Sequence, residues 1–363
     1  MNKTIKIALL VTGALAILAG AYFGWEYLNS APTYSNPTDS ADNNGSVGAA
    51  KLQILTNAEV FDFWMNKKTN EIYYLTKDGK ISKLLEDKSS QAISSQNIPD
   101  LSYVEPSSDG LLALIAFGFP QSPSFSVFNT ANKSFQPLPQ GTTAVDWDPL
   151  SNNRVVYLKN GAGSSVLSIL DLSSKKSSEI IKIFQKDLSL DWTSADIVYL
   201  NDRPSGEGSG STWSLNIKSK IFKTISAEKP EVEIKWLTSK IGLKSSLGLL
   251  SLINTDGKET NTIRLRAAAN KCLNDRLLIF CSAPLNQNSK TNSFDAELKK
   301  PSTQEGIYVI SLVDYENRSS LLASSWPYNN ELDTPINAAR LEKQGGTLIL
   351  LNRFDHLLYS ISL

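Results

Sequence analysis

The chain has 363 residues, of which 41% are hydrophobic and 20% are charged, values typical of a globular protein with a sizeable core. Its 36 basic residues balance its 36 acidic residues, so no net field attracts nucleic acid, and we expect no nucleic-acid partner. One histidine and two cysteines leave very little for metal binding or nucleophilic catalysis.

An uncharged apolar segment lies near the start of the chain. Residues 7–25 carry no charge and are preceded by Lys3 and Lys6. About 20 apolar residues span a bilayer as a helix, whereas the apolar region of a signal peptide usually holds about 7–15 residues. We therefore predict a single-pass transmembrane signal anchor at residues 7–25. A cleaved signal peptide, with "AGA" at 19–21 as its small-residue site, remains the alternative.

The charges that flank this segment predict its orientation. Two lysines precede it, and the next basic residue after it is Lys51, so the positive-inside rule places residues 1–6 in the cytoplasm. The rest of the chain then lies outside the cytoplasmic membrane, and a cleaved signal peptide would export it as well. Residues 26–50 are rich in Ser, Asn, Asp, Pro, Gly and Ala, a composition that predicts a flexible linker.

A pattern of short strands and polar turns repeats from residue 51 onward. Each unit begins with a strand, a polar turn and a second strand, and continues with a second hairpin. The units are 40 to 45 residues apart when they are aligned on Trp64, Val104, Trp147, Trp192 and Trp236. Four strands per unit of this length predict the blades of a β-propeller. We expect the four tryptophans to pack in the core between blades.

The last two units are less regular. A sixth unit begins at residues 270–284 and has its predicted outer hairpin at 306–323, with a polar insertion at 285–305 that we expect to be an exposed loop. The seventh unit, from residue 336, holds only three strands. A strand at 52–56 can supply the fourth by pairing with the last strand at 357–363. We therefore predict one all-β domain over residues 51–363 with seven blades, and six blades as the alternative.

Two turns carry a resemblance to a known class of repeats. The segments "VEPSSDG" at 104–110 and "WDPLSNN" at 147–153 approach the W-S-P-D-G-like turn between the first two strands of TolB-type units. Residues 51–363 thus resemble the WD40-like and TolB-like propeller repeats of exported bacterial proteins. The Trp147-Asp148 pair precedes the second strand, whereas eukaryotic WD40 repeats place Trp-Asp at the end of the third.

No catalytic, cofactor-binding or metal-binding residue can be selected from the sequence. The segment 206–213 is similar to a sialidase Asp box, but Gly208 occupies the aspartate position. His356 is the sole histidine, and we expect it in a turn of the last blade. Cys272 and Cys281 are nine residues apart, which places them opposite one another in a hairpin with a two-residue loop. We predict a disulfide there, with two buried thiols as the alternative.

Two classes of function fit these observations. The first is a membrane-tethered extracytoplasmic module, not an enzyme, that binds a protein or a polymer of the cell envelope. The second is a propeller hydrolase or lyase that acts on extracellular glycans or peptides. Carboxylates and arginines that converge from several blades at one mouth of the channel would favour the enzyme. A channel lined by Ser, Asn and apolar residues would favour the binding module.

Overall fold

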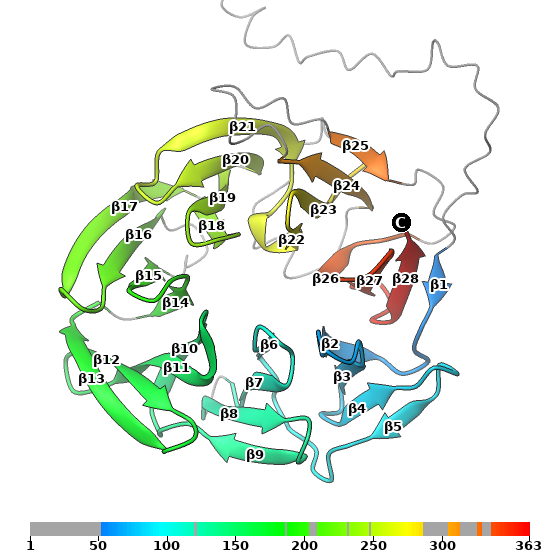
Figure 1. The fold of residues 1–363 in the computed structure, drawn as a ribbon, viewed down its shortest axis with the longest axis horizontal. Coiled ribbons are helices and arrows are strands. Elements are labelled where there is room, and N and C mark those ends of the chain that lie inside the picture. The colour runs from blue at the N-terminus through cyan, green and yellow to red at the C-terminus, as the bar shows by residue number, and fades with distance from the viewer. Residues whose placement is uncertain are drawn as a thin grey trace, which may run out of the picture. The chain divides into compact units, whose positions relative to one another are not determined.

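Seven four-stranded antiparallel sheets form a ring of blades (Figure 1). The computed structural model describes residues 52–119, 122–185, 187–202, 209–230, 232–246, 248–285, 304–312, 325–328 and 335–363. The predicted all-β propeller with seven blades is confirmed, and six blades are excluded. The predicted anchor, the linker and most of the 285–305 insertion lie outside the described residues. No helix among the described residues is long and apolar enough to cross a bilayer.

The strands of each blade follow one another in the chain from the centre of the ring outward. Blade 1 contains β2 (Val60–Met65), β3 (Ile72–Thr76), β4 (Ile81–Leu84) and β5 (Ser90–Ala92). Blade 2 contains β6 (Tyr103–Pro106), β7 (Leu112–Phe117), β8 (Ser124–Asn129) and β9 (Ser134–Pro137). Blade 3 contains β10 (Thr142–Asp148), β11 (Ser151–Asn160), β12 (Ser165–Asp171) and β13 (Lys176–Ile183). Blade 4 contains β14 (Leu188–Trp192), β15 (Ile197–Asp202), β16 (Ser209–Asn216) and β17 (Ile221–Pro230).

The remaining three blades follow the same scheme, with one exception at the closure of the ring. Blade 5 contains β18 (Val232–Trp236), β19 (Ile241–Ser246), β20 (Leu249–Asn254) and β21 (Glu259–Arg266). Blade 6 follows the 3-10 helix η1 (Ala269–Lys271) and contains β22 (Cys272–Asp275), β23 (Leu278–Pro284), β24 (Glu305–Ser311) and β25 (Ser325–Tyr328). Blade 7 contains β26 (Ala338–Gln344), β27 (Thr347–Asn352) and β28 (Leu358–Ser362), and its outermost strand is β1 (Gln53–Ile54).

Pairing of β1 with β28 closes the ring, as the sequence predicts. Gln53 lies opposite Ser360 in an antiparallel register. Beyond the strand, the backbone N–H of Leu55 donates to the carbonyl oxygen of Leu358 at 2.8 Å. The backbone N–H of Leu358 in turn donates to the hydroxyl of Thr56 at 3.0 Å. The first described segment of the chain is therefore held against its last strand by backbone and side-chain hydrogen bonds.

The outer part of blade 6 differs from the prediction. The strand β24 overlaps the start of the expected hairpin at 306–323. The fourth strand is β25, which lies further along the chain and pairs with β24, with Trp326 opposite Val309. This strand contains Pro327, which has no N–H to donate. An outermost strand tolerates proline because only one of its edges pairs with another strand. The prediction from the apolar pattern at 306–323 therefore put the outermost strand too early in the chain.

The hydrophobic core lies between adjacent blades rather than within one blade. Trp147 is buried with Phe125 of blade 2, and its indole N–H donates to the carbonyl oxygen of Glu105 at 2.9 Å. Trp192 is buried with Leu158 of blade 3. Both tryptophans therefore pack against the blade that precedes their own.

The other two repeat tryptophans differ in detail. Trp236 is half-buried and stacks on Tyr199 of blade 4, with ring centroids 3.9 Å apart. Trp64 is fully buried but packs with Val104 of blade 2, the following blade. Phe63, the preceding residue, packs with Ile349 of blade 7, because neighbouring residues of a strand face opposite ways.

A buried ion pair joins blades 6 and 7. The ammonium of Lys271 donates to the carboxylate of Glu305 and to the side-chain oxygen of Asn337. Glu305 also accepts a hydrogen bond from the hydroxyl of Ser282 at 2.7 Å and from the backbone N–H of Ala338 at 3.2 Å. The Glu305 side chain has no exposed surface. These neighbours therefore contribute to the compensation of its charge inside the protein.

Deletion of residues 51–57 should lower the solubility of the protein more than deletion of residues 36–42. The first deletion removes the strand that closes the ring and leaves an unpaired edge on β28, whereas the second removes an equal length of the predicted linker. The soluble and aggregated fractions of the two variants, measured after identical expression, check this expectation. Equal soluble fractions would contradict the importance of this closure.

Replacing Lys271 by methionine should lower the free energy of unfolding by about 3–5 kcal/mol, because it removes the ammonium that is paired with the buried Glu305 carboxylate. The matched control is Lys223→Met, which breaks an exposed pair with Asp256 and should cost less than about 1 kcal/mol. Urea denaturation of both variants compares the two costs. Similar midpoints for both variants would show that the buried pair does not stabilise the contact between blades 6 and 7.

Candidate functional site

The innermost strands of the blades surround the centre of the ring (Figure 1). Six of these strands carry charged side chains that act on one another or on a neighbouring blade. All of these side chains are half-buried. They are Asp62 on β2, Glu105 on β6, Asp146 on β10, Asp191 on β14, Lys235 on β18 and Arg340 on β26. Electrostatic interactions reach across the ring, since Arg340 of blade 7 acts on Glu105 of blade 2 and on Lys235 of blade 5. Charged groups from several blades therefore converge, which the sequence did not show.

Three carboxyl groups on consecutive blades form the acidic part of this set, and we call them the carboxyl trio: Glu105, Asp146 and Asp191. The side chains of Glu105 and Asp146 share a hydrogen bond. Asp146 also accepts hydrogen bonds from the backbone N–H groups of Trp147, at 2.7 Å, and of Trp192 in the next blade. The Asp191 carboxyl accepts one from the side-chain amide of Asn201 at 2.8 Å.

Burial makes the carboxyl trio hard to ionise. Burial first, and the neighbouring charge of Asp191 second, raise the pKa of Glu105 to about 7. Burial raises the pKa of Asp191 to about 6. The pKa of Asp146 lies well above its usual range because of burial first, and of Glu105 and Asp191 second. Two carboxyls that share a hydrogen bond and cannot both ionise readily will hold a proton between them at neutral pH.

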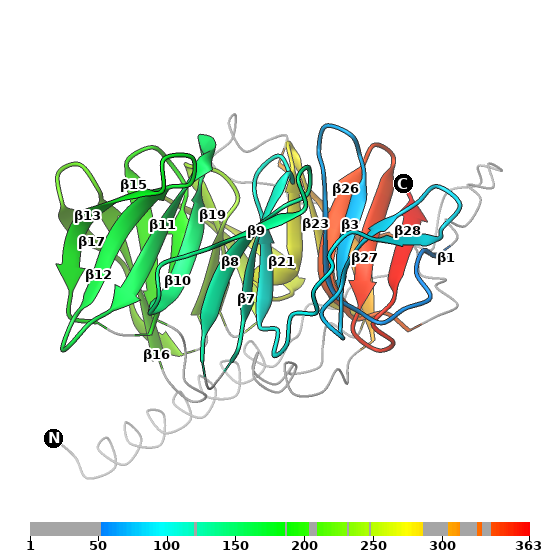
Figure 2. The same cartoon turned by 90° about the horizontal axis from the view of Figure 1, so that it is seen from below.

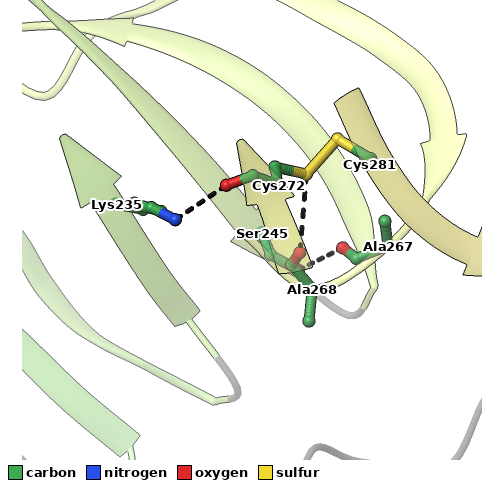
Figure 3. The surroundings of a disulfide bond; sticks show 6 residues. All are labelled: Lys235, Ser245, Ala267, Ala268, Cys272 and Cys281. Carbon is green, nitrogen blue, oxygen red and sulfur yellow. Dashed lines mark hydrogen bonds between the residues drawn. A yellow bond between two sulfur atoms is a disulfide. The ribbon is translucent and has the colours of Figure 1, made fainter. Parts of the chain in front are cut away.

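The two cations at the centre are paired with groups outside the trio. Arg340 donates to the carboxylate of Asp62 at 2.8 Å and to the carbonyl oxygen of Val104 at 3.1 Å. Lys235 donates to the carbonyl oxygen of Cys272 at 2.7 Å (Figure 3), and burial lowers its pKa. Within the described part of the chain, no lysine or arginine forms a salt bridge with any member of the carboxyl trio.

A cleft of about 330 Å³ opens where the innermost strands of blades 2, 3 and 4 begin. We refer to it as the cleft. It is lined by Ser102, Tyr103, Glu105, Phe119, Ala144, Val145, Ser189 and Leu190. Figure 2 shows the strands of these blades side by side, with the connections between strands gathered at the two faces of the ring. Glu105 belongs both to the cleft and to the carboxyl trio, so the acidic groups lie next to this opening.

One wall of the cleft is held in place by aromatic contacts. The rings of Tyr103 and Phe119 both pack edge to face against Phe125, each with ring centroids 6.1 Å apart. Phe125 itself is buried in the core between blades 2 and 3. The lining also includes Val145 and Leu190, which are buried. The cleft is therefore a preformed opening with apolar walls and a carboxyl group.

The cysteines that the sequence singles out lie elsewhere. Cys272 and Cys281 face one another across β22 and β23 and are joined by a disulfide (Figure 3). Both are buried in the core between blades 5 and 6. His356 lies in the turn between β27 and β28 with a φ of 58°. The described residues include no group of three or more His, Cys, Asp or Glu side chains placed to hold a metal ion.

The central charges were not predicted from the sequence, although a signal was present. In three successive units a charged residue stands immediately before the repeat tryptophan, and these residues are Asp146, Asp191 and Lys235. Neighbouring positions in a strand face opposite ways, so a residue beside a core tryptophan has a different environment from the tryptophan itself. Carboxylate pairs were conceivable from the sequence, but nothing in their spacing selected these.

Comparison with known proteins shows the architecture but no close relative. No family model matches the chain, and no curated protein matches it. Solved structures that are similar at low identity include the RRP9 WD40 repeats, with 10% identity over 87% of this chain and 99% of that one and a TM-score of 0.56. An oligogalacturonate lyase in complex with manganese has 9% identity over 87% of this chain and 94% of that one, with a TM-score of 0.58. The Myceliophteria thermophila Cps50 (Swd1) β-propeller domain has 8% identity over 86% of this chain and 99% of that one, with a TM-score of 0.56.

The chain is a seven-bladed β-propeller with WD40-repeat structural neighbours. At identities of 8–10% this likeness carries the fold and nothing further. An origin in a bacterial envelope and a TolB-type repeat stay predictions from the sequence. Any function has to be argued from the cleft and the groups beside it.

Replacing Glu105 by glutamine should make the stability of the protein less dependent on pH. Its pKa is about 7 in the folded protein against an ordinary value of 4.5, so the folded state holds this proton more tightly than the unfolded state. The resulting stability is present below about pH 4.5 and is lost as the pH rises through about 7. We expect the thermal midpoint of Glu105→Gln to fall less than that of the wild type between about pH 5 and 8.

The control for this comparison is Glu179→Gln, which changes an exposed carboxylate on the outermost strand of blade 3. It should keep the pH dependence of the wild type. The ionisable groups that act on Glu105 are retained in both variants and are Asp146, Asp191, Lys235 and Arg340. Identical pH profiles for Glu105→Gln and the wild type would show that Glu105 does not titrate as described.

Proposed function

We propose that this protein is a membrane-tethered, extracytoplasmic binding module that holds a protein partner or an envelope polymer at the cleft. The observation that carries the proposal is a preformed cleft of about 330 Å³ at the start of three innermost strands. Its volume is at the lower end of the range of ligand sites, so it admits one side chain or one small ring rather than an extended chain. A module of this kind recognises a projecting group on a larger partner.

The tether and the location rest on the sequence. Residues 7–25 are long enough to span a bilayer, and the lysines before them favour export of the remainder of the chain. The disulfide between Cys272 and Cys281 is consistent with this location, because such bonds persist in oxidising compartments. A rigid ring with connections at both faces suits a module that presents a binding surface above a membrane.

A hydrolase or lyase is the second candidate, and the converging charges favour it. Such convergence is the feature expected of an enzyme, and the hydrogen-bonded pair Glu105 and Asp146 resembles carboxyl pairs that share one proton in acid–base catalysis. One structural neighbour is named as an oligogalacturonate lyase.

Two features of the site argue against the enzyme. The direct hydrogen bond between Glu105 and Asp146 does not match the carboxyls of inverting glycosidases, which stand about 6.5–9.5 Å apart to admit a water. The small cleft also leaves little room for a polymer segment at the carboxyl pair. The geometry therefore supports binding better than hydrolysis.

One labelling experiment in intact cells tests both the location and the binding. The protein has two cysteines, which are joined to one another, so Ser102→Cys at the exposed rim of the cleft introduces a single free thiol. A membrane-impermeant thiol reagent that carries a photo-crosslinker should label this variant. Illumination should then cross-link it to a discrete partner. The control Glu179→Cys, on the outermost strand of blade 3, should be labelled but should not capture the same partner.

The outcomes separate the two parts of the proposal. Labelling of Ser102→Cys only after the cells are permeabilised would contradict the extracytoplasmic location. Labelling without a cross-linked product that is specific to the cleft would contradict the binding function. For the enzyme alternative, hydrolysis products that disappear in Asp146→Asn would replace the proposal.

A further inference from the structure

We propose that the group received by the cleft is a basic side chain, a lysine or arginine that projects from a protein partner. This inference rests on the proposed binding function and specifies its ligand. It derives from the acidic charge beside the cleft that no salt bridge compensates and from the apolar lining of the cleft.

No member of the carboxyl trio forms a salt bridge among the described residues, although Arg340 and Lys235 lower the pKa of Glu105 from a distance. Arg340 is bound to Asp62 and to a backbone carbonyl, and Lys235 is bound to the carbonyl of Cys272. No other lysine or arginine in the described ranges forms a salt bridge with the trio. Three acidic groups within one half-buried region repel one another and are poorly solvated, so a cation placed among them gains more than it would at an open surface. Among the described residues, Lys235 and Arg340 act on the trio only from a distance, and no cation forms a salt bridge with it.

The walls of the cleft fit the stem of a basic side chain. Tyr103 and Phe119 form a rigid aromatic wall because both pack on the buried Phe125. Val145 and Leu190 add aliphatic surface to the lining. Lysine and arginine bury their methylene groups along apolar surface while the charged end reaches a polar partner, and an aromatic ring adds to the attraction. The apolar walls would receive the stem, and Glu105 would receive the charge.

The same charges discriminate against other ligands. An acidic side chain or an anionic polymer would meet the negative charge of the trio and be repelled. A neutral apolar side chain would contact the apolar lining of the cleft but would offer no charge to the carboxyl groups. A basic side chain satisfies both parts of the site. It also favours ionisation of Glu105, whose proton it displaces.

Calorimetric titration of the full-length protein in detergent tests this inference. The probes are glycine- and serine-based decapeptides that differ at one central position, which holds lysine, arginine, norleucine or glutamate. Norleucine keeps the apolar stem of lysine and removes the charge. We expect the lysine and arginine peptides to bind at least about ten-fold more tightly than the norleucine peptide, since a charge-assisted hydrogen bond is lost. The glutamate peptide should not bind.

Two variants connect this binding to the cleft. Glu105→Gln should lower the affinity for the lysine peptide at least about ten-fold, whereas Glu179→Gln should leave this affinity unchanged. Loss of binding in Glu105→Gln would not reflect unfolding, because removal of this buried carboxyl should stabilise the protein at pH 8. Equal affinity of the lysine and norleucine peptides, or equal affinity of Glu105→Gln and the wild type, overturns the inference.

The cross-linking and peptide experiments together distinguish failure of the proposed function from failure of the inference. If Ser102→Cys captures a partner but the peptides show no preference for lysine or arginine, the inference fails and the binding module stands. If Ser102→Cys captures nothing and no peptide binds, both fail. If the cross-linked segment of the partner carries a basic residue whose replacement by alanine abolishes capture, both are supported.

Discussion

The pairing of β1 with β28 is the contact on which the rest of the structure depends. Each blade buries its apolar faces against its two neighbours, so an open ring would expose two such faces and an unpaired edge. Gln53 and Ile54 prevent this by adding the fourth strand to blade 7. Closure also fixes the distance between innermost strands all around the ring. The positions of the charged groups at the centre result from that constraint.

Closure brings charged side chains close together at the centre of the ring. Like charges repel one another there, and burial removes water from all of them. Arg340 and Asp62 compensate each other across blades 7 and 1, and Lys235 finds a backbone carbonyl on blade 6. For Glu105, Asp146 and Asp191, burial and their mutual repulsion outweigh their hydrogen bonds and the more distant cations, so their pKa values rise. This arrangement costs folding stability at neutral pH unless a ligand compensates it. Stability given up at one place in an otherwise well-packed ring is expected of a functional site.

The repeated hairpins were predicted correctly because strand alternation and turn residues are local features. The opposition of Cys272 and Cys281 is equally local, since a two-residue turn fixes their register. The outermost strand of blade 6 was predicted at the wrong position, because β25 contains a proline and is separated from β24 by a stretch of chain. Trp64 was aligned with the other tryptophans, yet it faces the following blade, because Phe63, one position earlier in the strand, faces blade 7.

By itself the sequence determined the class of fold, the number of blades and the strand that closes the ring, because these depend on hydrophobic periodicity and on the count of strands per unit. Only the tertiary structure decided that Glu105, Asp146 and Asp191 act on one another and that a cleft opens beside them. These residues are about 40 positions apart in the chain. Electrostatic coupling depends on distance in space, and that distance is set only when neighbouring blades pack into the ring.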